Sequence, residues 1–408
     1  MDQAPAWNEL LSHLADGPRE NGTAGLARAA LDLVGYLQHA GLTVERVPFT
    51  AHPYEIRLLG VFVLAACLVF LYLVRRSRIG AALLISLLIP LVVILTVEFG
   101  LPVFGGLGAT RQDNIVARIP ADFPQQRLIF TAHYDTKTDL VDHVVRTPIQ
   151  LLGLPICGLM IMASGFAIAS RNSSRRDKAK RFLKIVAMAA AVYGILFFLA
   201  YSGGAILRAR SSGSLDDGAA CAVLVRSATV LAQSPPMRHT TVEFIFFSGE
   251  ELGGEGSNQY VISQFNRSAP LPTYIINFDP VGASRTFAVT GRESRLFRSY
   301  RPDPHLVQSM DAVYRELTGS PLTVTSRGGL TDGFAFASRD IPTATIISEV
   351  PPFILPRGMH TAKDMRSRID VPSLDLTEEL LLHFVRRIED QGMNFRRSIH
   401  AQKKTAVQ

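Results

Sequence analysis

The segment FIFFSGEELGGEG, residues 244–256, joins an apolar run directly to two adjacent glutamates and then to glycines. From Thr241 to Phe247 nearly every residue is β-branched or aromatic, which predicts a strand buried on both faces of a sheet. Such a strand would deliver Glu250 and Glu251 to the edge of an open α/β sheet, where these folds place their ligand sites. Paired acidic residues are also typical of a helix start, because the helix dipole favours them there. Whether other polar residues of the chain could form a site with these glutamates therefore decides between the two interpretations.

Polar residues follow two other strand-like runs in the same way. The run LIFTA, residues 128–132, ends in His133, and the run YIINF, residues 274–278, ends in Asp279. Two aspartates open an alanine-rich helix expected over 219–232, a position where aspartates are often helix caps. Carboxylates and imidazoles suit a divalent cation such as zinc, and two neighbouring cations need a shared anionic ligand. The candidates, in chain order, are His133, Asp216, Glu250, Glu251, Asp279 and His360.

Helices and strands alternate along the polar parts of the chain. Residues 24–40 have apolar side chains at helical spacing and end at Gly41, and residues 43–49 then alternate as a strand does. A further strand is expected over 341–347, and a closing helix with one apolar face over 374–390. This alternation predicts an α/β fold.

Two pairs of long apolar segments interrupt this pattern. Residues 58–74 and 79–97 form the first pair, and residues 149–169 and 185–207 form the second. At about 1.5 Å per residue, each segment is long enough to cross a hydrocarbon core of roughly 30 Å. A short basic turn separates the two members of each pair. We therefore predict two transmembrane helical hairpins, with helices buried in a large soluble core as the alternative.

The two basic turns also account for the charge of the chain. The net charge is +7, but the segments 75–78 and 171–184 together carry more positive charge than this excess, so nucleic-acid binding by the remainder is not expected. Lysine and arginine near the ends of spans are retained on the cytoplasmic side, which places both turns in the cytoplasm. The chain has three cysteines, whose apolar surroundings indicate neither a disulfide framework nor a cysteine zinc site.

An even number of spans in each insertion leaves all the polar pieces on the opposite side of the membrane. We predict that residues 1–55, 98–148 and 208–396 form one extracytoplasmic domain, which is periplasmic, extracellular or lumenal. Residues 56–97 and 149–207 would be the two hairpins, and residues 397–408 a basic tail.

Five polar motifs, in order, resemble those of the family-28 metallopeptidases, the co-catalytic zinc aminopeptidases. The motifs are HYD at 133–135, LDDG at 215–218, SGEELGGEGS at 248–257, NFDPVG at 277–282 and MHT at 359–361. The resemblance covers the polar portion from about Arg111 to Asp370, together with the opening helix and strand. It implies a mixed sheet with helices on both faces, a peptide substrate and two Zn²⁺ ions, although other divalent metals could serve.

The resemblance also implies a ligand set. His133 and Asp279 would hold one zinc, Glu251 and His360 would hold the other, and Asp216 would bridge the two. In the family, a cis peptide bond joins the residues that correspond to Asp216 and Asp217, and the residue at Asp135 supports the site without binding metal. Glu250 would be the general base, taking a proton as metal-bridged hydroxide attacks the carbonyl and returning it to the leaving amine.

The departures from the family pattern concern the substrate. Many members have Ser-Asp-His where this chain has Thr331, Asp332 and Gly333, which we expect to line the substrate pocket. The resemblance implies an aminopeptidase, whose peptides could be attached to or released from the membrane. Two alternatives remain: an enzyme resembling glutaminyl cyclases, which use one zinc, and an inactive peptidase-like receptor or scaffold. Loss of ligands would be expected for a scaffold, whereas this chain keeps all five and the base.

Overall fold

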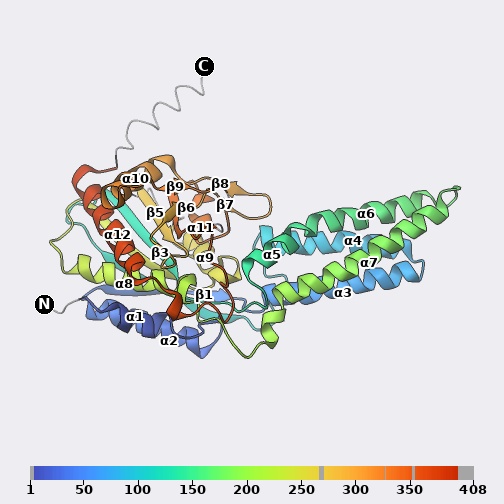
Figure 1. Ribbon diagram of the computed structural model, residues 1–408, viewed down its shortest axis with the longest axis horizontal. Coiled ribbons are helices and arrows are strands. Elements are labelled where there is room, and N and C mark those ends of the chain that lie inside the picture. Colours follow the sequence, from blue (N-terminus) through green and yellow to red (C-terminus); the bar gives the residue numbers. More distant parts are fainter. Residues whose placement is uncertain (1–3, 266–270, 327, 352–353, 394–408) are drawn as a thin grey trace, which may run out of the picture.

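Eight strands form one mixed sheet in the computed structural model, which describes residues 4–265, 271–326, 328–351 and 354–393 (Figure 1). Their order across the sheet is β1-β2-β4-β3-β5-β10-β6-β9. The strands are β1 (Thr43–Ala51), β2 (Thr110–Ile119), β3 (Gln126–His133), β4 (Thr240–Phe247), β5 (Thr273–Phe278), β6 (Phe287–Val289), β9 (Thr323–Val324) and β10 (Thr343–Ser348). Strands β3, β4, β5 and β10 are parallel, whereas β1, β2 and β4 pair in antiparallel fashion. The short strands β7 (Glu293–Ser294) and β8 (Ser299–Tyr300) pair separately.

Helices cover both faces of this sheet. Strand β4 explains why, since Phe244 and Phe246 point into one hydrophobic core while Ile245 and Phe247 point into another. Burying each of these large side chains stabilises the fold by about 1.5–3 kcal/mol. The first core is covered by α1 (Trp7–Leu14), α2 (Ala24–His39), α8 (Ala219–Ala232), α10 (Pro304–Thr318) and α12 (Val371–Gln391), and the second by α9 (Glu255–Gln264) and α11 (Gly333–Ala337). The predicted α/β class, with a mixed sheet and helices on both faces, is confirmed.

The apolar segments form a helical bundle that extends away from the α/β body (Figure 1). Within the described residues, four helical segments are long and apolar enough to cross a membrane: 55–75, 79–98, 143–169 and 176–201. Their inward faces share a core that includes Phe70, Met160 and Ala187, while outward residues such as Leu84 remain exposed. The elements are α3 (Glu55–Arg75), α4 (Ile79–Val93), the π-helical turn η1 (Ile94–Glu98), α5 (His143–Leu151), α6 (Gly153–Ala169) and α7 (Arg176–Tyr201).

The second hairpin begins earlier than its apolar stretch. The sequence pattern places its start at residue 149, but α5 begins at His143 because the Asp142 side chain caps it, accepting a hydrogen bond from the Val145 N–H at 3.2 Å. The expected basic tail, residues 397–408, lies outside the described residues.

Strand directions place both hairpins at one edge of the sheet. Ala51, at the end of β1, pairs with Thr110, at the start of β2, and β2 runs antiparallel to β4. The first hairpin, inserted between β1 and β2, therefore leaves the body at the carboxyl end of β4. The second hairpin follows His133, the last residue of β3, and so leaves at the same edge. The bundle and the polar strand ends are thus neighbours.

Candidate metal centre

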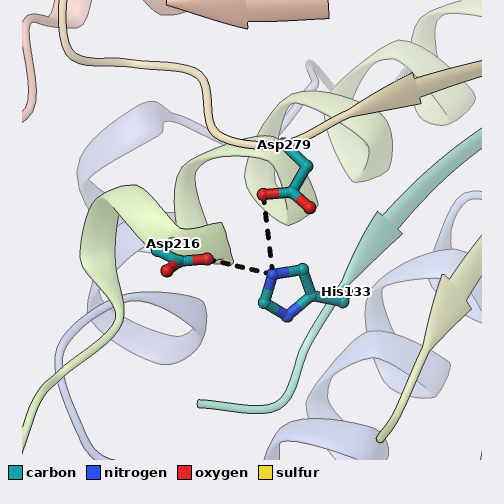
Figure 2. A group of neighbouring side chains, drawn as sticks. All are labelled: His133, Asp216 and Asp279. Atoms are coloured by element: carbon teal, nitrogen blue, oxygen red, sulfur yellow. Dashed lines mark hydrogen bonds and ion pairs between the residues drawn. The ribbon is translucent and has the colours of Figure 1, made fainter. Parts of the chain in front are cut away.

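The polar residues meet where the parallel strands end. His133 is the last residue of β3, Asp279 follows β5 directly, and the paired glutamates follow β4 after a two-residue turn. Asp216 lies in the turn before α8, and its peptide bond to Asp217 is cis. His360 comes from the loop between β10 and α12. Figure 2 shows His133 with the two aspartate carboxylates directed at its ring.

The first candidate cation site is formed by His133, Asp216 and Asp279. The Nε2 atom of His133 lies 3.0 Å from Oδ1 of Asp216 and 3.9 Å from Oδ1 of Asp279 (Figure 2). All three side chains are buried. Because two ligand atoms of one tetrahedral zinc lie about 3.4 Å apart, these separations fit a shared cation.

The second candidate site is formed by Asp216, Glu251 and His360. Here His360 Nε2 lies 2.8 Å from Oδ2 of Asp216 and 3.1 Å from Oε1 of Glu251. Within the described residues, neither of these two buried carboxylate oxygens accepts a hydrogen bond, as expected for atoms directed at a cation. Asp216 therefore lies between two histidines, with one oxygen facing each.

The charges of the site also fit a divalent cation. Burial, followed by the Glu250 and Asp217 carboxylates, raises the pKa of Asp279 well above its usual range. Burial and the neighbouring Glu251 also raise the pKa of Glu250. Burial opposes ionisation of Glu251 too, but His360 and Lys137 lower the pKa of that carboxyl to about 2. Bound cations would relieve the repulsion among these carboxylates, so the donor set fits the implied zinc ions.

Comparison with known proteins supports this interpretation. Residues 200–385 match the model of Peptidase family M28. The match includes Asp216, Glu250, Glu251, Asp279 and His360, and together with the fold it supports assignment to the M28 family. No curated protein matches the chain.

Several solved structures resemble the chain at low sequence identity. The Legionella pneumophila LapA aminopeptidase is 14% identical with a TM-score of 0.52, covering 94% of this chain and 70% of that one. A Zn-dependent exopeptidase from Parabacteroides distasonis is 14% identical with a TM-score of 0.53, and the coverage is 94% and 98%. The Bacteroides thetaiotaomicron glutaminyl cyclase, also 14% identical, has a TM-score of 0.55 and the same coverage. These likenesses show the fold.

Asp135, the third residue of the HYD motif, supports the glutamate pair. Its Oδ1 atom accepts a hydrogen bond from the Glu250 N–H at 3.2 Å, and its Oδ2 atom accepts one from the Glu251 N–H at 3.1 Å. Asn21, which was not predicted as a site residue, donates to the same Oδ2 at 2.6 Å. Asp135 thus holds the backbone from which both glutamates project.

Three charged residues beside the second cation site were also not anticipated. Lys137 Nζ lies 2.7 Å from Oε2 of Glu251, and Asp139 Oδ2 lies 3.5 Å from Nδ1 of His360. Arg146, on α5, binds the same Asp139 oxygen at 2.5 Å. A carboxylate on the far nitrogen of a metal-binding histidine fixes its ring orientation. The alternating charges of Asp135, Lys137 and Asp139 are the sequence feature from which this charged cluster could have been predicted.

The third unanticipated feature is Arg19, whose side chain is buried between the HYD and LDDG motifs. Its guanidinium donates to the carbonyl oxygens of Tyr134, at 2.9 Å, Ser212, at 2.7 Å, and Gly213, at 2.9 Å. Tyr134 adjoins His133, and Gly213 begins the turn that contains Asp216. Arg19 therefore joins the loops that carry two of the proposed ligands. No pattern around Arg19 in the sequence indicates this role.

We expect the substitution Arg19→Met to destabilise the body by about 3 kcal/mol, because several buried carbonyl groups lose their donor. The melting temperature of detergent-purified protein should fall by roughly 5–10 °C. The matched control is Arg28→Met, which removes an exposed arginine of α2 and should leave the melting temperature unchanged. Equal melting temperatures for both variants would show that Arg19 does not hold the two loops together.

The expected pocket residues Thr331, Asp332 and Gly333 lie in a buried region. Thr331 Oγ1 donates to Oε2 of Glu293 at 2.9 Å, and a side chain at Gly333 would collide with Thr345 Oγ1. Asp332 is buried, and burial, opposed by His133, raises its pKa to about 7. The contacts of Thr331 and Gly333 therefore support the loop, and contact with substrate remains a prediction for all three.

Proposed function

We propose that this chain is a membrane-embedded zinc aminopeptidase that binds two metal ions and hydrolyses peptide bonds. The observation that carries the proposal is the position of Asp216, whose two oxygens lie 3.0 Å from His133 Nε2 and 2.8 Å from His360 Nε2. A carboxylate shared by two histidine–carboxylate pairs can serve as the anionic bridge that two neighbouring cations need. His133 and Asp279 would hold one ion, and Glu251 and His360 the other.

Zinc ions bound there would polarise the peptide carbonyl and lower the pKa of the attacking water. The side chains around them would hold and move the protons. Glu250 is adjacent in sequence to the proposed ligand Glu251, and its Oε2 atom lies 4.0 Å from His133 Nε2. Glu250 would accept a proton from the attacking water and return it to the leaving amine.

The surrounding residues would keep these groups in place. Asp135 holds the backbone of both glutamates, and Asp139 would orient the ring of His360 through Nδ1. Lys137 would neutralise the Glu251 oxygen that does not face His360, leaving Oε1 for the cation. The chain thus supplies a base, five ligands and their supports.

Two other functions remain as alternatives. A glutaminyl-cyclase-like enzyme would use one zinc, and the presence of both His133 and Asp279 in the first candidate site favours two. An inactive receptor or scaffold would not need five converging ligands and a base. The retained residues therefore favour the peptidase.

One experiment tests the three possibilities together. Zinc content of detergent-purified protein should approach two per chain, and peptides with a free N-terminus should release free amino acids. N-acetylated peptides serve as the control, because an aminopeptidase should leave them intact. Cyclisation of N-terminal glutamine without amine release would favour the cyclase, and zinc-loaded protein that does neither would favour the scaffold.

We further propose that peptides reach the site at the membrane surface. Both hairpins leave the body at the sheet edge that carries the site, which favours substrates attached to or released from the membrane. The same peptide sequences can be compared in soluble form and tethered to vesicles that contain the protein. A higher kcat/KM for the tethered form is expected, and equal values would oppose the proposal.

The proposed orientation places the α/β body outside the cytoplasm, because the basic turns would stay in the cytoplasm. In a variant with its three buried cysteines replaced, Ser174→Cys should be protected from a membrane-impermeant thiol reagent in intact cells. Gln38→Cys, exposed on α2, should react. Permeabilised cells provide the control, since both positions should then react. The opposite pattern would place the candidate site in the cytoplasm.

A further inference from the structure

The turn that carries the two glutamates is built on glycines. We call residues 249–255 the glutamate turn. Gly249, Gly253 and Gly254 all have positive φ, and the N–H groups of Gly253 and Gly254 both donate to the Glu250 carbonyl at 2.8 Å. Glycine tolerates these conformations without strain but confers little rigidity by itself. The position of Glu250 therefore depends on what holds the turn from outside.

One external support comes from Arg295, the first residue of the turn between β7 and β8. Its Nη2 atom donates to the carbonyl oxygen of Gly253 at 2.8 Å. Its Nη1 atom donates to the carbonyl oxygens of Val97, at 3.2 Å, and Glu98, at 3.3 Å. One guanidinium thus joins the glutamate turn to the last turn of the first apolar hairpin.

The last turn of the first apolar hairpin also forms hydrogen bonds with the β7–β8 hairpin. The buried Glu98 carboxylate accepts hydrogen bonds from the Phe297 N–H at 3.0 Å and from Arg298 Nε at 2.6 Å. Gly100 approaches Arg295 closely, and a Cβ there would lie 2.9 Å from Nη1. These contacts fix the place from which Arg295 reaches the glutamate turn.

The other end of the first hairpin contacts the same turn. His52, three residues before α3, donates its backbone N–H to Oε2 of Glu255 at 2.8 Å. Its Nδ1 atom lies 3.1 Å from Oε1 of the same glutamate. The glutamate turn is therefore connected to both ends of the first hairpin, through His52 at the entry and through Arg295 at the exit.

We propose that Arg295 is a positioning residue for Glu250, and that the first hairpin is part of the framework of the site as well as an anchor. Arg295 touches neither candidate cation site; it acts through Gly253, two residues after Glu251. Loss of its contacts would free one side of a glycine-rich turn and displace the base. The effect on turnover rests on the proposed peptidase function, whereas the connection to the hairpin does not.

The test uses the full-length protein and three variants. Arg295→Met removes the donors and keeps much of the apolar stem, while Arg295→Lys keeps the charge and can donate to Gly253. The matched control is Arg292→Met, at an exposed position next to the same hairpin. Hydrogen exchange of the amides in residues 249–255 is measured by mass spectrometry, and kcat and KM are measured with a free N-terminal peptide.

For Arg295→Met we expect amide exchange in the glutamate turn to be about tenfold faster, with the core strands unchanged. We also expect kcat to fall by about 10- to 10²-fold at nearly constant KM and zinc content, because a displaced base weakens proton transfer without removing the metal ligands. Arg295→Lys should lie between wild type and Arg295→Met, and Arg292→Met should match wild type.

Three outcomes would overturn the inference: exchange and kcat equal to those of Arg292→Met, faster exchange throughout the body without selectivity for the turn, or an Arg295→Lys variant no better than Arg295→Met. If Arg295→Met does not fold, the lysine variant decides by the same measurements. If wild type hydrolyses no peptide, the proposed function fails while the exchange result still tests the connection.

Discussion

Replacing Asp216 with asparagine should remove both of the proposed zinc ions at once. Each of its oxygens faces a different histidine, at 3.0 and 2.8 Å, so this carboxylate serves both candidate cation sites. Asparagine has nearly the same shape but no charge, and the two cations would then repel each other without a shared anion. Loss of a supporting residue outside the ligand shell already costs about 10- to 100-fold in metal affinity, and we expect a larger loss here.

The measurement is zinc content after dialysis against a weak chelator, together with peptide hydrolysis. Asp390→Asn, at an exposed position near the end of α12, is the control and should keep its zinc. Retention of two zinc ions by Asp216→Asn would contradict the bridging role. Retention of one ion would show that the two sites are independent.

The substitution Glu250→Gln, in contrast to Asp216→Asn, should leave the zinc content unchanged. It should reduce turnover by about 10²- to 10⁴-fold. Glu250 belongs to neither three-residue cluster, so its carboxylate is not needed to hold a cation. It lies within 4.0 Å of His133 Nε2 on a backbone held by Asp135, which is suitable for accepting a proton from a water at the site. Glutamine can still accept a hydrogen bond but cannot take up the proton.

Two controls make this result interpretable. Glu379→Gln changes an exposed glutamate on α12 and should hydrolyse peptides at the wild-type rate. The zinc content of Glu250→Gln, measured on the same preparation, separates a lost base from a lost metal. Normal turnover in Glu250→Gln would refute the assignment of the base, whereas loss of zinc would make Glu250 a ligand.

The fold was predictable wherever a strand or helix has a simple pattern of apolar residues in the sequence. The continuous apolar run that ends at Phe247 predicted a central strand, and β4 is buried along its whole length. Residues 219–232 were predicted as a helix and form α8. The start of α5 was not predictable in the same way, because it depends on the Asp142 side chain rather than on the apolar stretch that follows.

By itself, the sequence determined which polar residues follow strands and which segments are apolar enough to span a membrane. It did so because strand and helix periods, and the length of an apolar run, are local properties. Only the tertiary structure placed one oxygen of Asp216 beside each histidine, Arg19 between two loops, and Arg295 between Gly253 and the end of the first hairpin. These contacts join residues up to about 200 positions apart, and hydrogen bonds to backbone carbonyls leave no residue pattern at the acceptor, since every residue has that group.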